Sequence, residues 1–359
     1  MAKEVILTGL RANAEFHLGN YLGGILPMVQ QQKKHAGKYQ LNMFIPDLHS
    51  FTTPIDHGKL YEQTYQNLKV FVAAGLDINQ PDTFVYRQSY IPAHSELTWI
   101  LSCFSYFGEL RRMTQFKEKT SGTKKPDDFM ITDIVAYVDD PHASVATAGL
   151  FIYPVLMAAD ILIYGAKYVP VGEDQRQHVE FARDIAMRIN NKFGDIFVLP
   201  ADNNEQLKFA GREKPVRIRS LRNPERKMSK SVEDPAGTIM LNDKPEDGAK
   251  KIMAATTDNL EEKVLSPNFE SRPGVANLVQ ILKLLKPDDE HKVSDMTYKE
   301  FKVIVAETVS EFLKDLQIKL PAIDDKQLMQ KLEADEEAMR KVADATLLKV
   351  QKAVGLRPA

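Results

Sequence analysis

The feature that most constrains the fold is an alternation of short apolar runs with helix-like segments over the first two-thirds of the chain. The apolar runs occupy residues 5–9, 41–45, 83–86 and 168–172, and each contains or lies close to a glycine or a proline. Apolar residues recur at helical spacing between them, around 58–74, 95–115, 152–164 and 174–191. This order predicts an α/β fold with a doubly wound parallel sheet, whose ligands lie beyond the carboxyl ends of the strands.

The last third of the chain has a different pattern. Two series of mostly apolar residues keep helical spacing, Phe301, Ile304, Val305, Thr308, Phe312 and Leu316 in the first and Leu328, Leu332, Met339 and Val342 in the second. Asp335 interrupts the second series. We therefore expect a mainly helical part from about residue 232 onward, packed on or beside the sheet.

A short basic stretch, Lys-Met-Ser-Lys-Ser at 227–231, contains two cations and two hydroxyls around one apolar residue. Four arginines surround it, at Arg217, Arg219, Arg222 and Arg226. Such a loop suits a polyphosphate, because lysines neutralise phosphate oxygens and hydroxyls donate to them. The alternative is a solvated basic loop, which is the usual meaning of a charge cluster.

A second candidate motif, His-Leu-Gly-Asn at 17–20, follows the first apolar run. Helical spacing begins directly after it at Tyr21, although Pro27 needs a place in the first turn or marks a break. A helix start offers unpaired N–H groups to an anion, and Gly19 would let a base or a phosphate approach the backbone. The alternative is that His17 and Asn20 simply cap the helix.

The two motifs together resemble the two signatures of class I aminoacyl-tRNA synthetases. The chain contains no GxxxxGK[ST], GxGxxG or HExxH pattern that would favour another nucleotide or zinc site. Three further segments resemble tryptophanyl-tRNA synthetases in particular: YPVLMAAD at 153–160, GEDQ at 172–175, and GEL with MTQFKEK at 108–119. This resemblance covers most of residues 5–232.

The resemblance implies two domains. The first is a Rossmann-like catalytic domain at 1–231, which holds the HLGN, GEDQ and KMSKS motifs and a long insertion-like connection at 118–147. The second is a helical domain at 232–359 that binds the anticodon side of tRNA. It further implies tryptophan–tRNA ligase activity, with L-tryptophan, ATP and tRNA(Trp) as substrates, and a homodimer.

The amino-acid pocket can be argued from the chemistry of indole, whose one polar atom is an N–H that only donates. Asp160 is a carboxylate in an otherwise apolar helix, and the resemblance places it on that N–H. Met157 stands where tyrosyl-tRNA synthetases have a glutamine, which favours the larger apolar ring. The resemblance implies a tryptophan site made of Leu7, His49, Tyr153, Met157, Asp160, Val169, Val171 and Gln175. The alternatives are a lysine partner for Asp160 and a capping or core role for His49.

For ATP, the resemblance implies catalytic contacts to the phosphates from His17, Asn20, Lys117, Lys119, Lys227 and Lys230. The wider ATP site would comprise Arg11, Gly19, Asn20, Gly172, Asp174, Ile218, Lys227, Met228, Ser229 and Lys230. Gly172 and Asp174 would meet the ribose, and Ile218 and Met228 would flank the adenine. Mg²⁺ is expected to travel with ATP, because no acidic cluster suggests a dedicated metal site.

The chain departs from the family pattern just before HLGN. Where the family has Pro and Gly, this chain has Arg-Ala-Asn-Ala at 11–14, which puts the geometry of the ATP loop in question. Two rival functions stay open: tyrosyl activation or another nucleotidyl transfer on the same fold, and a binding or regulatory paralogue that does not charge tRNA.

Composition places few further limits. The net charge of −2 means that nucleic-acid binding must depend on local basic patches. Cys103 is the single cysteine, and the first residues resemble neither a signal peptide nor a membrane span, so we expect a cytoplasmic protein. The apolar stretch near Trp99, Phe104 and Tyr106 is either an interface or core.

Overall fold

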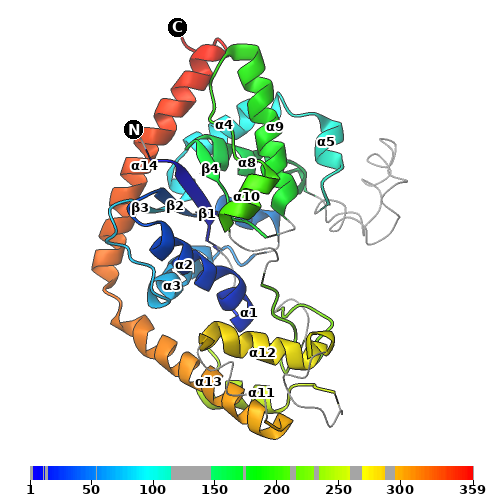
Figure 1. Ribbon diagram of the computed structural model, residues 1–359. Coiled ribbons are helices and arrows are strands. Elements are labelled where there is room, and N and C mark those ends of the chain that lie inside the picture. Colours follow the sequence, from blue (N-terminus) through cyan, green and yellow to red (C-terminus); the bar gives the residue numbers. More distant parts are fainter. Residues whose placement is uncertain are drawn as a thin grey trace.

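Four parallel strands form one sheet in the order β3-β2-β1-β4, as the alternating sequence predicts (Figure 1). They are β1 (Val5–Gly9), β2 (Gln40–Ile45), β3 (Thr83–Arg87) and β4 (Ala166–Tyr168). The computed structural model describes residues 3–10, 12, 15–53, 55–114, 147–172, 175–210, 216–229, 234–258, 269–287 and 296–358. The central strand β1 pairs with β2 on one side and with β4 on the other, so the direction of strand order reverses at β1.

Helices account for most of the remaining described chain. Those around the sheet are α1 (Leu18–Asn20), η1 (Tyr21–Ile25), α2 (Leu26–His35), η2 (Leu48–Thr52), α3 (Leu60–Ala73), η3 (Gln88–Tyr90), α4 (Ala93–Ser102), α5 (Phe107–Arg111), α8 (Ala148–Leu162), α9 (Arg176–Phe193) and α10 (Asn203–Ala210). Those that follow are α11 (Pro245–Met253), η6 (Phe269–Ser271), α12 (Pro273–Leu285), α13 (Tyr298–Lys319), η8 (Leu320–Ala322) and α14 (Asp325–Ala353). Within the described ranges, none of these helices combines the length and the apolar character that a bilayer crossing needs.

The sheet has apolar residues on both faces, and each face is covered by its own helices. Along β1, Ile6 joins the core that contains α2 and α3, whereas the next residue, Leu7, joins the core that contains α4, α8 and α9. Successive side chains of a strand point to opposite faces, so this division follows from the strand geometry. The arrangement is the doubly wound one that the sequence predicts.

Two predicted elements have different bounds in the structure. The strand expected at 168–172 is wrong over most of its length, because β4 ends at Tyr168 and residues 169–172 form no strand. Pro170 lacks the N–H that a continued ladder needs. The helix expected at 95–115 is two helices, α4 and α5, with a break at 103–106.

Pro27 takes the first of its two predicted places, in the first turn of α2. The turn before it, η1, is a π-helix, in which the Leu26 N–H donates to the Tyr21 carbonyl five residues earlier. Proline cannot donate the next hydrogen bond, and a π-turn absorbs that local mismatch without ending the helix. The helical segment therefore runs without a break from Leu18, within HLGN, to His35.

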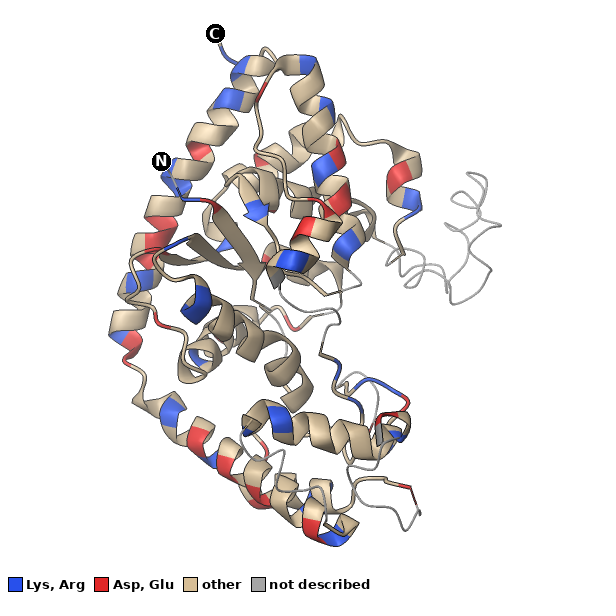
Figure 2. Ribbon diagram, in the orientation of Figure 1, with Lys and Arg blue, Asp and Glu red and all other residues tan. Residues whose placement is uncertain are grey.

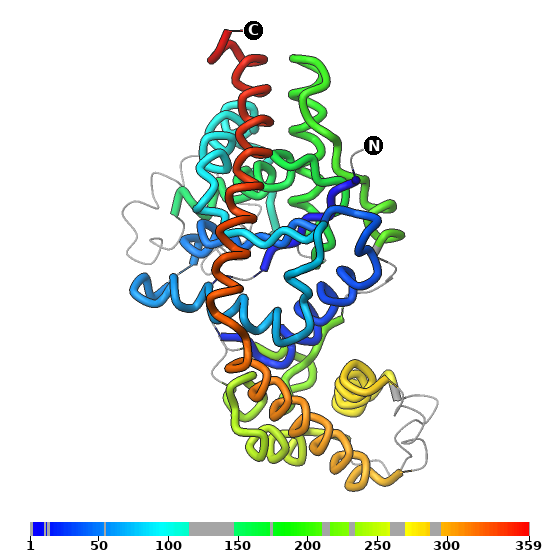
Figure 3. Tube along the Cα trace, turned by 90° about the vertical axis from the view of Figure 1, so that its left-hand side faces the viewer, coloured from blue at the N-terminus to red at the C-terminus, as the bar shows by residue number. Residues whose placement is uncertain are grey.

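The C-terminal part is mainly helical, and α11, α12 and α13 gather at one end of the molecule (Figure 1). Acidic and basic residues are spread along α13 and α14 (Figure 2). A ring contact of 4.5 Å between Tyr21 of η1 and Phe312 of α13 joins this end to the first helix of the sheet region. The last helix, α14, leaves this end and runs along the sheet region to the C-terminus (Figure 3).

Helix α14 covers the open edge of β3 with polar side chains. Asp335 accepts a hydrogen bond from the Val85 N–H at 2.7 Å, and Glu336 accepts one from the Arg87 N–H at 3.2 Å. The Arg87 guanidinium also donates to both oxygens of Glu336, at 2.6 and 3.0 Å. The residue that interrupts the apolar series of α14, Asp335, is thus buried against a strand edge whose N–H groups would otherwise be unpaired.

We predict that Glu336→Ala destabilises the protein strongly. The side chains of Arg87 and Glu336 are only 6% and 4% exposed, so the substitution leaves a buried guanidinium and a strand N–H without an acceptor. Removing one member of a buried pair costs about 3–5 kcal/mol. The measurement is the free energy of unfolding in urea, for wild type and variant.

The matched control is Glu337→Ala, one residue further along α14. Glu337 pairs with Lys341 on the surface, where its side chain is 67% exposed, and such pairs contribute about 0–1 kcal/mol. Equal losses of stability in the two variants would show that the edge contact of Glu336 is not what stabilises α14 on the sheet.

Candidate active site

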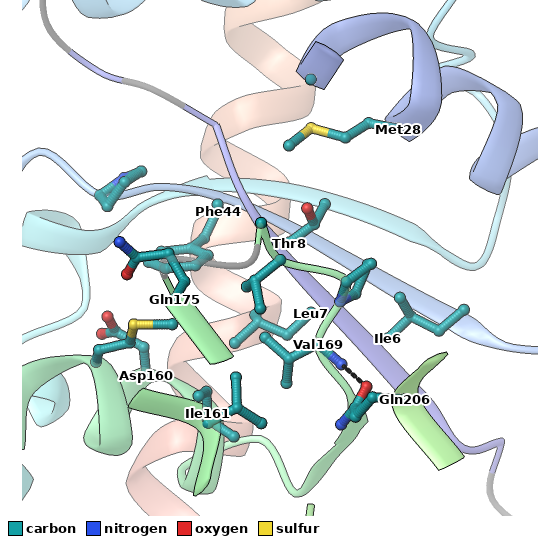
Figure 4. A pocket seen from close by; sticks show the side chains of 18 of the residues that line it. Ile6, Leu7, Thr8, Met28, Phe44, Asp160, Ile161, Val169, Gln175 and Gln206 are labelled. Atoms are coloured by element: carbon teal, nitrogen blue, oxygen red, sulfur yellow. Dashed lines mark hydrogen bonds between the residues drawn. The ribbon is translucent and has the colours of Figure 1, made fainter. Parts of the chain in front are cut away.

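A cavity of about 530 Å³ opens beyond the carboxyl ends of β1, β2 and β4 and against α8 (Figure 4). Its walls are mostly apolar, with a few polar groups that converge on it, as is usual for small-molecule sites. The structure brings all eight residues of the expected tryptophan site to this cavity, together with Gly172: Leu7, His49, Tyr153, Met157, Asp160, Val169, Val171 and Gln175.

Helix α8 supplies three of these side chains from one face. Tyr153, Met157 and Asp160 are four and three residues apart, which is the spacing of neighbours on one side of an α-helix. All three line the cavity, although Asp160 is only 1% exposed. The carboxylate therefore lies at the inner end of an apolar cavity, below Met157.

The buried Asp160 carboxylate accepts three hydrogen bonds. Gln88 Nε2 donates to Oδ1 at 2.7 Å, and His94 Nδ1 lies 2.6 Å from the same oxygen. His49 Nε2 lies 2.8 Å from Oδ2. No lysine of the described part of the chain pairs with Asp160, and its described partners are two histidines and a glutamine.

These contacts determine the charge of Asp160. Burial raises the pKa of its carboxyl group. The hydrogen bonds and charges of His49 and His94 lower that pKa by more than burial raises it, so the pKa lies below its ordinary value. Because the folded-state pKa is lowered, the ionised form stabilises the fold at neutral pH, and that stabilisation is lost as the pH falls through the lowered pKa.

The sequence analysis did not single out Gln88 and His94, and both are fully buried. Gln88 follows β3 directly, at the carboxyl end of a parallel strand, and this position is a signal that could have identified it. His94 lies in the first turn of α4, and no pattern in the sequence connects it with Asp160, 66 residues further on.

Tyr153 has a second contact besides the cavity. Its hydroxyl lies 2.8 Å from Nε2 of His178 on α9, and its ring meets the His49 ring edge-on at 6.2 Å. Both contacts fix the orientation of the phenol at the cavity wall. Gln175 borders the same cavity just before α9 begins.

Residues 169–172, where a strand was expected, receive support from α10 instead. Gln206 accepts a hydrogen bond from the Val169 N–H at 3.0 Å and donates to the Lys167 carbonyl at 3.1 Å (Figure 4). The side-chain amide thus pairs the backbone beyond the end of β4. Residues 169–172 therefore line the cavity without pairing to a neighbouring strand.

The HLGN motif forms a reciprocal cap at the start of α1. Nδ1 of His17 accepts from the Asn20 N–H at 3.2 Å, and Oδ1 of Asn20 accepts from the His17 N–H at 3.2 Å. The capping alternative considered above is therefore present in the structure. Because Nδ1 is an acceptor, the neutral His17 ring has its proton on Nε2.

The two signature motifs lie side by side, although about two hundred residues separate them in the sequence. A Cβ placed on Gly19 would lie 3.4 Å from Cβ of Met228, which shows how closely the backbones approach. The segment after KMSKS also pairs with the start of HLGN, because the Leu18 N–H donates to the Ile239 carbonyl at 2.8 Å. Gly23 and Val216 then connect this region with the cavity wall.

Ile218 and Met228, expected to flank the adenine, are both buried in the core and do not line the cavity. Their backbones pair with each other, the Met228 N–H donating to the Ile218 carbonyl at 3.0 Å. Lys227 is exposed beside them, and the carbonyl of Ser229 accepts from the Thr238 hydroxyl at 3.1 Å. The adenine contact expected of Ile218 and Met228 therefore stays a prediction.

Several expected site residues lie outside the described residues: Arg11, Lys117, Lys119, Asp174 and Lys230. The same holds for most of the connection at 118–147. Of the segment that departs from the family pattern at 11–14, only Ala12 is described, and it is buried in the core beside α3, where Thr64 donates to its carbonyl.

Within the described ranges, no group of three or more His, Cys, Asp or Glu side chains could hold a metal ion. The donor set around the cavity, one carboxylate already bonded to two histidines and an amide, does not suit Mg²⁺, which prefers several oxygen ligands.

A comparison with known families matches residues 2–327 to the model of the class I tRNA synthetases "W and Y". Among curated relatives, a tryptophan–tRNA ligase of Caldanaerobacter subterraneus subsp. tengcongensis is 38% identical, with 98% of each chain covered. One of Clostridium perfringens is also 38% identical, over 99% of this chain and 98% of its own.

Solved structures agree with these relatives. The tryptophanyl-tRNA synthetase of Mycoplasma pneumoniae superposes with a TM-score of 0.80 at 32% identity, covering 99% of this chain and 98% of its own. That of Campylobacter jejuni, complexed with ADP and tryptophan, gives 0.74 at 30% identity, over 98% and 99% of the two chains. By its sequence, its sheet and its cavity, this chain belongs to the class I tRNA synthetases of the tryptophan and tyrosine group.

Proposed function

We propose that the chain is a tryptophan–tRNA ligase. It activates L-tryptophan with ATP to tryptophanyl-adenylate and pyrophosphate, and then transfers tryptophan to the 3′-terminal ribose of tRNA(Trp). Its similarity over nearly the full length to curated tryptophan–tRNA ligases supports this proposal, as does the Campylobacter jejuni structure with ADP and tryptophan.

The observation that carries the choice of amino acid is the buried, ionised Asp160 at the end of an apolar cavity. An indole N–H only donates, and a carboxylate only accepts, so the two match without a further polar group. Met157 lines the cavity next to Asp160 and adapts to a large apolar ring. Tyrosine would bring a phenol oxygen that also needs a donor, for which this wall offers no hydroxyl or amide at position 157.

The other cavity residues have roles that follow from their chemistry and position. Leu7, Val169 and Val171 form the apolar wall around the ring. Tyr153 and Gln175 hold the substrate ammonium group with their oxygen atoms, and His49 borders the ring beside Asp160. Gly172 and Asp174 meet the ribose of ATP.

The phosphate site combines the two signature motifs. Lys227 and Lys230, with Lys117 and Lys119, neutralise the charge that develops on the leaving pyrophosphate. His17 and Asn20 donate to the phosphates, Gly19 and Ser229 allow close approach, and Arg11 contributes a further cation. The proximity of HLGN to KMSKS in the fold supports this grouping.

The reaction needs no enzyme nucleophile. The tryptophan carboxylate forms a bond to the α-phosphorus of ATP, the bond to the bridging oxygen breaks, and pyrophosphate leaves with the electron pair. The protein positions the reactants and stabilises charge. Mg²⁺ enters bound to the ATP phosphates, since the described cavity has no carboxylate cluster to hold it.

Binding of tRNA uses two regions. Arg217, Arg222 and Arg226 are exposed near KMSKS and guide the acceptor end, while the helical domain at 232–359 meets the anticodon side. Cys103 is a free, exposed thiol, which suits a reducing compartment, and we place the reaction in the cytoplasm.

An ATP–pyrophosphate exchange assay with all twenty amino acids tests the activation step, and a tRNA-charging assay tests the second step. Exchange that depends on tryptophan, followed by charging, supports the ligase. Exchange that depends on tyrosine selects the rival enzyme, and tryptophan binding without charging selects a regulatory paralogue.

We also propose that the protein is a homodimer, and that the shared face is formed by α4, α5 and α8. Trp99, Tyr106, Phe107 and Ile152 expose large apolar surfaces on these helices, with Trp99 73% exposed. The Phe107 and Phe151 rings lie 4.9 Å apart, so the patch continues from α5 to α8. Contiguous exposed apolar surface of this kind is typical of an interface.

For the phosphate site, we predict that Lys227→Ala and Lys230→Ala lower the rate of adenylate formation more than the affinity for tryptophan. A cation that meets charge developing on pyrophosphate acts mainly in the transition state, and its loss costs about ten- to a thousandfold in rate. Pre-steady-state adenylate formation measures it, with the exposed Lys341→Ala on α14 as control. Adenylate formation at the wild-type rate in both variants contradicts the assignment.

For the amino-acid site, we predict that Asp160→Asn impairs tryptophan activation and spares ATP binding. The amide NH₂ would face the donors of Gln88, His94 or His49, so buried donors lose their acceptor. An unpaired buried polar group costs about 1–3 kcal/mol, or up to roughly a hundredfold in kcat/KM for tryptophan.

The measurement is pyrophosphate exchange with tryptophan, tyrosine and phenylalanine. Asp56→Asn, on the surface beside Lys59, is the control. Normal tryptophan activation by Asp160→Asn would show that Asp160 does not receive the indole N–H.

For the dimer, we predict that Trp99→Glu shifts the protein to monomers, because a charge at the centre of an apolar interface is desolvated without a partner. Sedimentation equilibrium measures the change. Ile318→Glu is the matched control, since Ile318 is 61% exposed on α13, at the other end of the molecule. A wild-type protein that sediments as a monomer would refute the interface.

A further inference from the structure

The three donors on Asp160 are distributed unequally between its two oxygens. Among the described residues, Oδ1 receives both Gln88 Nε2 and His94 Nδ1, at 2.7 and 2.6 Å, whereas Oδ2 receives only His49 Nε2, at 2.8 Å. A carboxylate has about four acceptor positions, two on each oxygen. Oδ1 is therefore saturated, and the remaining position belongs to Oδ2.

Gln88 is fixed at both ends of its side chain. Its Oε1 accepts from the Leu48 N–H at 3.2 Å, and its Nε2 donates to Asp160. The Oε1 contact defines which end of the amide faces the carboxylate. Gln88 thus connects the start of η2 with the carboxylate of Asp160. Its side chain is fully buried, so neighbouring atoms restrict it to this orientation.

His94 is fixed in the same way by Tyr164. Nε2 of His94 lies 2.8 Å from the Tyr164 hydroxyl. Burial raises the pKa of Tyr164 well above its ordinary value, so the phenol keeps its proton. The ionised Asp160 carboxylate only accepts, so Nδ1 of His94 donates its N–H to Oδ1.

The distribution matters for the ring that enters the cavity. An indole N–H needs one acceptor position, and Oδ2 supplies it. A phenol can donate to Oδ2 as well, but its oxygen also needs a donor. One N–H of Gln88 and the N–H of His94 on Nδ1 are committed to Oδ1, and neither residue lines the cavity, so neither supplies that donor. A buried acceptor without a donor is penalised, which is how a polar site discriminates between ligands of similar size.

We propose that Gln88 and His94, with Tyr164 behind His94, are positioning residues that saturate Oδ1 of Asp160 and leave Oδ2 as the acceptor for an aromatic N–H. They thereby select an indole over a phenol without touching either ring. This inference rests on the proposed tryptophan–tRNA ligase function and names the residues that set the selectivity of its site.

The contacts of Asp160 also determine how activity depends on pH. The described titratable groups that face Asp160 are His49 from η2, His94 from α4, Tyr86 from β3 and Tyr164, two residues after the end of α8. The hydrogen bond from His94 is one of the contacts that lower the pKa of Asp160. Without it that pKa rises, and protonated Asp160, which can no longer accept freely, appears at higher pH.

The decisive variants are His94→Leu, His94→Asn and Gln88→Glu. His94→Leu removes the donor to Oδ1. His94→Asn keeps a donor, because the asparagine NH₂ occupies nearly the place of the imidazole Nδ1–H. Gln88→Glu is nearly isosteric and sets a second carboxylate against Asp160, which forces one of the two to hold a proton.

Pyrophosphate exchange as a function of pH, with tryptophan and with tyrosine, reads out the effect. For His94→Leu and Gln88→Glu we expect a loss of about tenfold or more in kcat/KM for tryptophan, expressed in the KM for tryptophan and not in the KM for ATP. We also expect a smaller preference for tryptophan over tyrosine, and an acid limb of the pH profile that moves to higher pH. His94→Asn should restore most of the kcat/KM for tryptophan, of the preference over tyrosine and of the wild-type acid limb.

His35→Leu is the matched control, because His35 is a buried histidine of α2 that stacks on Phe209 and makes no contact with Asp160. It should leave the selectivity and the pH profile unchanged. Folded His94→Leu or Gln88→Glu with wild-type selectivity and an unmoved acid limb overturns the proposal. If His94→Leu does not fold, Gln88→Glu decides alone. A wild type that does not activate tryptophan refutes the proposed function instead, so the two failures are distinguishable.

Discussion

The burial of one carboxylate organises the centre of this protein. Asp160 is 1% exposed, and a carboxylate can remain ionised there only if donors replace the water that it loses. Those donors come from three separate elements, η2, η3 and α4, which follow or flank the carboxyl ends of β2 and β3. The same contacts that satisfy Asp160 therefore fix the inner wall of the cavity.

A second constraint acts at the edge of the sheet. A four-stranded parallel sheet has two open edges, and α14 covers that of β3 with Asp335 and Glu336. Gln88, which donates to Asp160, follows β3 directly. The helix that covers the edge of β3 therefore also supports the strand that positions Gln88. Helix α14 starts beside the other C-terminal helices, so the sheet region and the helical end share one rigid element (Figure 3).

The sequence was sufficient for features that depend on local patterns. The parallel sheet and the face shared by Tyr153, Met157 and Asp160 follow from periodicity, and the geometry of proline limited Pro27 to two places, of which the structure shows one. It was insufficient where distant groups meet. Nothing local connects His94 with Asp160, or explains that Asp335 breaks an apolar series in order to pair a strand edge. The strand expected at 168–172 failed for a related reason, because Gln206, a residue of a distant helix, pairs that backbone.

The structure shows one of the two interpretations of HLGN, the cap, and the cap does not conflict with the phosphate role that we propose. His17 uses Nδ1, and Asn20 uses Oδ1, to accept backbone N–H groups at the start of α1. Both atoms of the cap are acceptors, so the two hydrogen bonds of the cap use neither Nε2 of His17 nor the NH₂ group of Asn20. The phosphate contact that we propose for HLGN needs donors, because an anion only accepts. Capping and the proposed contact therefore require different atoms of the same two side chains.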